Sequence, residues 1–199
     1  NVSEELLLEP EEFEGHWDPH VWFDPAIWSK CVDVVGDALT ENDPEGKAGY
    51  TERAEALKKE YLAVTEWAKV RISGLPKESR YLVTSHDAFN YFGRAFGLGV
   101  LAVQGISTAT EAGLADRVAM VDFVKKHEVK AIFVESSVNP AIIEGIAKEA
   151  GVKIGGELFS DSMGQTGRLE KGPDGEEYDT GTWSGMMKHN VNTIVEGLK

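Results

Sequence analysis

Apolar residues in the first part of the chain recur every three or four positions, which is the pattern of amphipathic helices. A first helix is expected from Pro25, in the first turn after the N-cap Asp24, to just before Asn42. A second is expected from Pro44 to Ser73. The residues expected to face inward are Ile27, Cys31, Val34, Val35 and Ala38 in the first helix, and Tyr50, Ala54, Leu57, Tyr61, Val64, Ala68 and Ile72 in the second. At ~1.5 Å per residue the second helix would be ~40 Å long, which favours an element that braces two bodies.

Beyond Pro76 the pattern changes to short apolar runs that alternate with amphipathic stretches. The expected strands are Tyr81 to Thr84, Leu98 to Val103, Ala131 to Glu135 and Val152 to Ile154. The expected helices are Ala88 to Phe96, Glu111 to Lys126 with Leu114, Val118, Val121 and Val124 inward, Pro140 to Ala150, and Thr182 to Leu198. The alternation predicts an α/β fold in which a four-stranded parallel sheet is flanked by helices. Residues 164–181, rich in glycine and charge, are expected to form a mobile surface loop.

Polar side chains follow the predicted strands at one edge of this sheet. His86 comes two residues after the first strand, Glu135 ends the third, and Asp161 follows the fourth by a short loop. Ligands of parallel α/β sheets gather beyond the carboxyl ends of the strands. We therefore expect His86 and Asp161 to approach each other there.

Composition narrows the classes of partner. The 199 residues are 42% hydrophobic, and 34 acidic against 20 basic residues give a net charge of -14. Such a charge disfavours nucleic acid and anionic lipid as partners. The single cysteine, Cys31, allows no internal disulfide, and no apolar run reaches the ~18 residues of a membrane span. The first five residues have neither the basic start nor the apolar centre of a signal peptide.

Two histidines lie in rigid settings flanked by carboxylates. His20 follows Asp18 and Pro19, and His86 precedes Asp87. Two imidazoles and the Asp161 carboxylate would suit zinc, manganese or iron, and the absence of thiolate ligands disfavours a structural zinc site. Asp18 and Asp87 are candidates for supporting these ligands by hydrogen bonds, and a helix N-cap is an equally good role for Asp87; we interpret both as structural.

Glu135 has two open interpretations, because it could orient a ligand or cap the helix near Pro140. The three remaining histidines, His16, His127 and His189, are expected to have surface roles.

Four motifs carry a family resemblance: Asp18-Pro19-His20-Val21-Trp22-Phe23-Asp24, the stretch 84–92, the stretch 133–137 and the stretch 156–163. In this order the chain resembles the cluster 9 metal-binding lipoproteins. These are the ZnuA/TroA-like extracytoplasmic substrate-binding proteins of zinc and manganese ABC transporters, and they are not enzymes.

The resemblance implies two α/β lobes joined by one long helix, with the metal in the cleft between them. It implies His20 as a ligand from the first lobe, and His86 and Asp161 as ligands from the second. The chain would then divide into a remnant of the N-terminal lobe (1–43), an interlobe helix (44–75) and a C-terminal α/β lobe (76–199). The implied partner is an ABC transporter permease, and the implied location is periplasmic or extracytoplasmic, with membrane contact only through that permease or a lipid anchor.

Members of this group carry a complete N-terminal lobe with a further histidine ligand before the Asp-Pro-His motif. The chain is therefore expected to be a C-terminal portion that binds metal more weakly than its parent. The identity of the metal is left undecided. The histidine at position 86 favours zinc, whereas other members have a glutamate there that is associated with manganese. Asp161 is compatible with manganese or iron. Two alternatives are an HD-type metal-dependent phosphohydrolase, an all-helical class, and a surface adhesin.

Overall fold

The computed structural model of this chain describes residues 3–10, 15–106 and 113–199. Its longer helices are α1 (Pro25–Asn42), α2 (Lys47–Ser73), α3 (Asn90–Phe96), α4 (Leu114–Lys126), α5 (Ala141–Ala150) and α6 (Trp183–Leu198). Its strands are β1 (Tyr81–His86), β2 (Gly99–Gln104), β3 (Ala131–Glu135), β4 (Lys153–Leu158), β5 (Leu169–Lys171) and β6 (Glu177–Asp179). Short 3-10 turns lie at Glu4–Leu6, Val21–Phe23 (η3), Pro44–Gly46 and Lys77–Ser79. The predicted start of the fourth helix at Glu111 lies outside the described residues.

The central strands form two parallel pairs. β1 pairs with β2, and β3 pairs with β4 with a shift of register between Ile132 and Val134. The inner strands β1 and β3 lie side by side but share no ladder hydrogen bonds. The predicted four parallel strands are all present, whereas one continuous four-stranded sheet is replaced by two hydrogen-bonded pairs that meet at the β1–β3 boundary.

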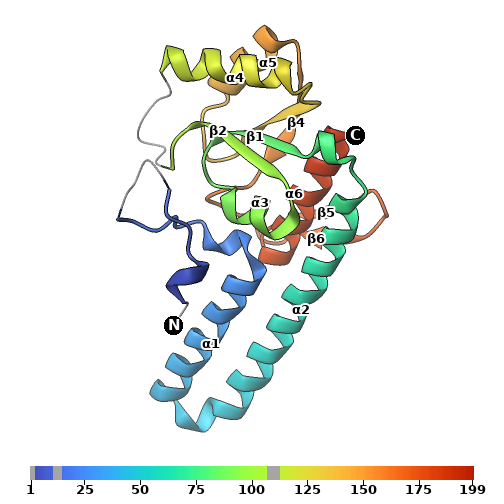
Figure 1. The fold of residues 1–199 in the computed structure, drawn as a ribbon. Coiled ribbons are helices and arrows are strands. Elements are labelled where there is room, and N and C mark those ends of the chain that lie inside the picture. The colour runs from blue at the N-terminus through green and yellow to red at the C-terminus, as the bar shows by residue number, and fades with distance from the viewer. Residues whose placement is uncertain (1–2, 11–14, 107–112) are drawn as a thin grey trace.

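Helices cover both faces of these strands (Figure 1). On one face, α4 and α5 pack against Val83, Val103 and Ile132. On the other face, α2, α3 and α6 enclose the larger core around Leu82 and Phe133. At Gly197 of α6, a Cβ atom would lie 2.8 Å from the ring of Phe133, so this close helix-to-strand packing requires glycine.

α1 and α2 form a long hairpin that projects from the α/β body (Figure 1). The predicted N-cap is confirmed: Asp24 Oδ1 accepts hydrogen bonds from the backbone N–H groups of Ala26 and Ile27. Towards its C-terminal end, α2 leaves α1 and packs on α6, where the rings of Tyr61 and Trp183 are 4.2 Å apart. α2 therefore ties the hairpin to the body.

Three of the predicted inward faces are partly wrong. In α2, Leu57 is 37% exposed. Val34 and Val35 of α1 are 52% and 57% exposed, because each helix of the hairpin has only the other to cover it and one narrow stripe is buried. In α4, Leu114 and Val118 are exposed as well. The buried stripe there is Met120, Val121 and Val124, which shares Val121 and Val124 with the predicted stripe but is rotated around the helix.

The prediction of a loop over residues 164–181 is also wrong in part. This segment contains the antiparallel hairpin β5–β6, with Glu170 opposite Tyr178. Asp174 at its turn lies 3.7 Å from Arg71 of α2, and Glu176 pairs with Lys188 of α6. The hairpin therefore packs against the body instead of projecting as a loop.

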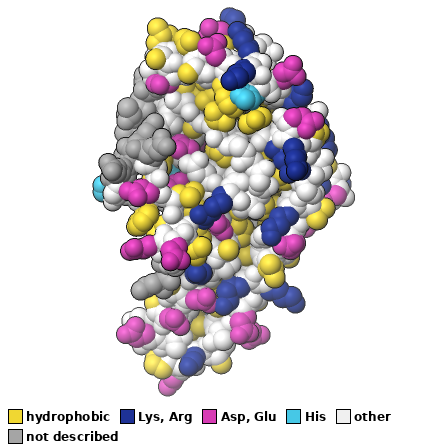
Figure 2. All heavy atoms as spheres, in the orientation of Figure 1, with side chains coloured by type: hydrophobic (Ala, Val, Ile, Leu, Met, Phe, Trp, Pro, Cys, Tyr) yellow, Lys and Arg dark blue, Asp and Glu magenta, His cyan; other side chains and the backbone are white. Residues whose placement is uncertain are grey.

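Charged side chains of both signs are interspersed over the face drawn in Figure 2. In the described part of the chain, none of the helices combines the length and apolarity needed to cross a bilayer. The division into segments 1–43, 44–75 and 76–199 stays a prediction.

Candidate metal centre

His86 and Glu135 meet where β1 and β3 end. Each is the last residue of its strand, and both side chains are buried. Glu135 Oε1 accepts hydrogen bonds from the backbone N–H groups of Ser85 (2.8 Å) and His86 (2.9 Å), and Oε2 lies 2.5 Å from Nδ1 of His86. The carboxylate thus accepts hydrogen bonds from two backbone N–H groups of β1 at the β1–β3 boundary, where no ladder hydrogen bonds form. It also fixes the imidazole at Nδ1, on the side away from Nε2.

A second carboxylate holds His20 in the same way. Asp18 Oδ1 accepts hydrogen bonds from the backbone N–H of His20 (2.9 Å) and from its Nδ1 (2.7 Å). Asp18 is itself fixed to α3, because its carbonyl accepts a hydrogen bond from the Tyr91 hydroxyl. A carboxylate can only accept, so the ring proton of a neutral His20 lies on Nδ1 and the Nε2 lone pair is free for a ligand.

Asp161 lies between the two imidazoles. Its Oδ1 is 3.4 Å from Nε2 of His20, and its Oδ2 is 3.4 Å from Nε2 of His86. The two histidine rings meet edge to face, with centroids 5.5 Å apart. The expected approach of His86 and Asp161 beyond the strand ends is confirmed, and the fold brings His20 to the same point.

These three residues have the geometry of a metal site. One ligand atom from each lies within 4.8 Å of the other two, and this is the only such group among the described residues. Two ligands bound at ~2.1 Å in a tetrahedral site are ~3.4 Å apart, which is the observed distance from Asp161 to each imidazole. Nε2 of His86 is buried and lies 3.4 Å from Asp161 Oδ2. A buried nitrogen aimed at a carboxylate at this distance fits a cation bound by both.

The pKa values show how closely these charges interact. Burial lowers the pKa of His86, but the contacts with Asp161 and Glu135 outweigh it and raise the pKa to about 9. Burial likewise lowers the pKa of His20, and Asp161 and Asp18 raise it above its ordinary value. The two histidines in turn hold the pKa of Asp161 well below its usual range. In the metal-free chain, a proton on the His86 imidazole therefore supplies positive charge that this site favours at neutral pH.

Neighbouring elements fix the backbone of the loop that carries Asp161. The side chain of the buried Asn190, on α6, accepts from Phe159 N (2.9 Å) and donates to Phe159 O (2.7 Å). The hydroxyl of Ser160 bonds to that of Ser137, and its carbonyl accepts a hydrogen bond from Trp22 Nε1 (3.1 Å). Asn190 is not among the site residues predicted from the sequence; its signal there is a polar residue within the apolar stripe of a helix.

The other residues considered from the sequence have different places. The N-cap of α3 is Phe89, not Asp87 as predicted. His16 is exposed, as expected. His127 is partly buried and stacks on Phe123, and His189 bonds to Glu170 and to the carbonyl of Glu157, so both have packing contacts beyond a plain surface role.

The structure also separates the two interpretations of Glu135. α5 has Pro140 at its N-cap and no side-chain cap, whereas Glu135 contacts His86 directly. Glu135 therefore orients a candidate ligand.

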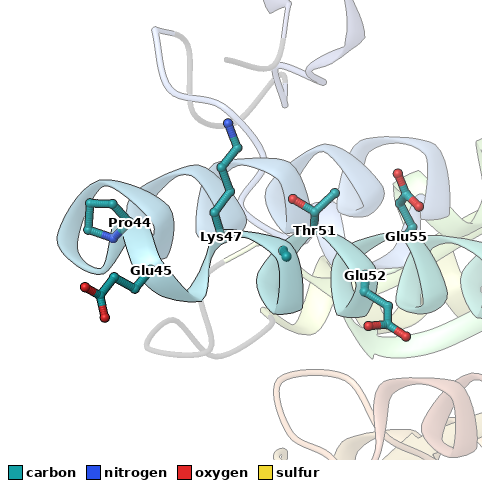
Figure 3. A pocket seen from close by; sticks show the side chains of 7 residues that line it. Pro44, Glu45, Lys47, Thr51, Glu52 and Glu55 are labelled. Atoms are coloured by element: carbon teal, nitrogen blue, oxygen red, sulfur yellow. The ribbon is translucent and has the colours of Figure 1, made fainter.

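A hollow at the tip of the α1–α2 hairpin contains none of the candidate ligands (Figure 3). It is lined by Pro44, Glu45, Lys47, Ala48, Thr51, Glu52 and Glu55. The residues that line this hollow are all exposed, so it contains no buried polar side chain. The histidine cluster is therefore the better candidate site.

Comparison with known proteins agrees with the resemblance seen in the motifs. The family described as ZnuA, zinc-uptake complex component A, periplasmic, matches residues 1–197. The chain belongs to this family. Zinc-binding protein TroA of Treponema pallidum is 40% identical over 202 residues, covering 99% of this chain and 61% of that protein. Manganese-binding lipoprotein MntA of Bacillus subtilis is 40% identical over 189 residues, covering 92% and 58%. The chain thus spans about three fifths of the length of these relatives.

Solved structures give the same fold. The periplasmic zinc-binding protein TroA from Treponema pallidum superimposes with a TM-score of 0.90 at 37% identity, covering 99% of this chain and 69% of that one. A laminin-binding protein of Streptococcus agalactiae, described as bifunctional with adhesin and metal transporting activity, has a TM-score of 0.78 at 31% identity, covering 92% and 65%. The predicted α/β fold class is confirmed, and this fold excludes the all-helical HD hydrolases.

Proposed function

We propose that this chain captures a divalent transition metal, zinc or manganese, as the substrate of an ABC uptake system. The ligands are Nε2 of His20, Nε2 of His86 and the carboxylate of Asp161. The observation that carries the proposal is that both imidazoles are held at Nδ1 by buried carboxylates while both Nε2 atoms face Asp161.

The chemistry of this site suits reversible capture. Nitrogen and carboxylate ligands accept zinc and manganese alike, and at neutral pH a metal must displace the proton that the His86 imidazole carries. The described residues supply no cysteine to the site, so no thiolate binds the metal there. In this proposal the metal is held and released without chemical change, so the chain acts as a receptor, in keeping with the zinc-uptake family that it belongs to.

The proposal extends to the location and the partner of the full-length protein, which are inferred from its relatives. The full-length protein acts outside the cytoplasmic membrane and delivers its metal to a transporter permease. The names of the family and of both relatives support this location and partner. They are a periplasmic zinc-uptake component, a zinc-binding protein and a manganese-binding lipoprotein.

Calorimetric titration tests the binding directly. The metal-free chain should bind one zinc or manganese ion per molecule, and His86→Ala should weaken this binding at least tenfold. His16→Ala is the matched control, because His16 is an exposed imidazole outside the cluster. Equal affinities for His86→Ala and the unmodified chain would overturn the proposed ligand set.

A further inference from the structure

Trp22 lies between the segment that carries His20 and the loop that carries Asp161. Its ring meets the His20 ring edge to face, with centroids 5.3 Å apart. Its Nε1 donates a hydrogen bond to the carbonyl of Ser160, the residue before Asp161. One side chain that is not a ligand therefore contacts both sides of the cluster.

The position of Trp22 is set from outside the Asp161 loop. Its carbonyl accepts a hydrogen bond of 2.9 Å from Nε1 of Trp183, at the start of α6. The next residue, Phe23, is fully buried and stacks on Phe89 with centroids 4.6 Å apart. The indole N–H is therefore a fixed donor, towards which the loop is oriented.

The three proposed ligands differ in how firmly the fold holds them. The side chains of His20 and His86 are 3% and 0% exposed, and each is held by a carboxylate. The side chain of Asp161 is 36% exposed and lies on a loop. Asp161 is thus the ligand with most freedom to leave a bound metal. Because the Ser160 carbonyl belongs to the planar peptide that leads into Asp161, fixing this carbonyl fixes the direction from which Asp161 enters the site.

We propose that Trp22 is a positioning residue for Asp161 and thereby slows the release of the bound metal. This inference rests on the proposed function. A neutral hydrogen bond makes a modest net contribution, so its loss should speed metal release about threefold to tenfold. Association should change less, because both imidazoles stay in place.

The test compares Trp22→Phe, which keeps an aromatic ring but removes the N–H donor together with part of the indole, with Trp28→Phe, which makes the same loss of size elsewhere. Trp28 is a matched control, since it is a partly buried indole on α1 that packs on the same core. Zinc release into excess chelator is followed by stopped flow, and the cobalt(II) absorption spectrum reports ligand geometry. We expect faster release and altered cobalt bands for Trp22→Phe, and values like those of the unmodified chain for Trp28→Phe.

Unchanged release and an unchanged cobalt spectrum in Trp22→Phe would overturn the role of Trp22 while leaving the proposed function intact. A lack of zinc and cobalt binding by the unmodified chain would overturn both. A second measurement needs no variant: solvent exchange of the Trp22 indole N–H should slow at least threefold when zinc binds, and that of Trp28 should not. Equal changes at the two indoles would also contradict the proposal.

Discussion

Glu135 and His86, 49 residues apart in sequence, share two contacts at the boundary between β3 and β1. One carboxylate oxygen of Glu135 accepts hydrogen bonds from the backbone N–H groups of Ser85 and His86, and the other lies 2.5 Å from Nδ1 of the His86 ring. The residue that closes the gap between the two strand pairs is therefore the residue that sets the orientation of a proposed ligand.

Glu135→Gln should weaken zinc binding about tenfold to 100-fold. The amide oxygen is needed by the two backbone donors, so the amide NH₂ group would face Nδ1 of His86. Nδ1 then has to accept, and the ring proton moves to Nε2, where it competes with the metal. Calorimetry measures the effect.

The control for this variant is Glu144→Gln, because Glu144 is an exposed glutamate on α5. It should bind zinc as the unmodified chain does. Should Glu135→Gln also retain full affinity, Glu135 would have a role only in joining the strands.

Glu135→Ala should also destabilise the fold, by about 3 kcal/mol, because it leaves two buried backbone N–H groups and a buried imidazole without their partner. Urea unfolding of the metal-free chain measures this difference. A loss below ~1 kcal/mol would mean that the β1–β3 boundary relaxes around the missing carboxylate.

The stability of the metal-free chain should fall as the pH rises from 6.5 to about 9. The pKa of His86 is raised from 6.5 to about 9, so its contribution is fully present below pH 6.5 and is lost as the pH rises through the folded value. Asp161 has a lowered pKa, so its contribution is present above its ordinary value of 3.8 and is lost only in stronger acid. Melting temperatures between pH 5 and 9, in the presence of chelator, should therefore decline on the alkaline side.

Zinc affinity should change in the opposite direction over the same range. Each proton that zinc displaces makes binding about tenfold tighter per pH unit below the pKa of its imidazole. His86→Ala should reduce the pH dependence of both the melting temperature and the zinc affinity. An alkaline decline in stability that persists unchanged in His86→Ala would show that another group titrates.

The helices could be predicted from the sequence because their apolar periodicity repeats over several turns. The parallel strands could be predicted because each is a short apolar run between amphipathic stretches. The boundaries of α1 and α2 differ from the prediction by a few residues at most. The inward face of α1 could not be predicted, since Val34 and Ile27 lie in one apolar pattern and only the placement of α2 decides which is covered. The hairpin β5–β6 was missed because its strands have three residues each, too few for alternation to appear.

The convergence of His86 and Asp161 could be predicted because parallel strands end at a common edge. The residues that support them could not. Asn190 holds the backbone of Phe159 across 31 residues. A polar residue within an apolar helix stripe marks Asn190 in the sequence, but only the packing of α6 on β4 shows that its partner is Phe159. The role of Glu135 stayed open for the same reason, since β1 and β3 are neighbours only in the folded chain.

Asn190→Leu should lower the free energy of unfolding by about 2–4 kcal/mol, because it leaves the N–H and the carbonyl of Phe159 without their partner. Zinc affinity should fall as well, because Phe159 leads into Asp161. Asn42→Leu, at the exposed end of α1, is the control and should leave zinc affinity unchanged. Denaturant unfolding and calorimetry on both variants measure these differences. Full stability of Asn190→Leu would show that the loop needs no support from α6.

The most direct test of the central claim is the anomalous scattering of zinc in crystals of the metal-loaded chain. The ion is expected within about 2.0–2.2 Å of Nε2 of His20, Nε2 of His86 and a carboxylate oxygen of Asp161. Both Nδ1 atoms should still face Asp18 and Glu135. An anomalous peak elsewhere in the molecule, or a zinc ion bound by ligands other than these three residues, would contradict the account.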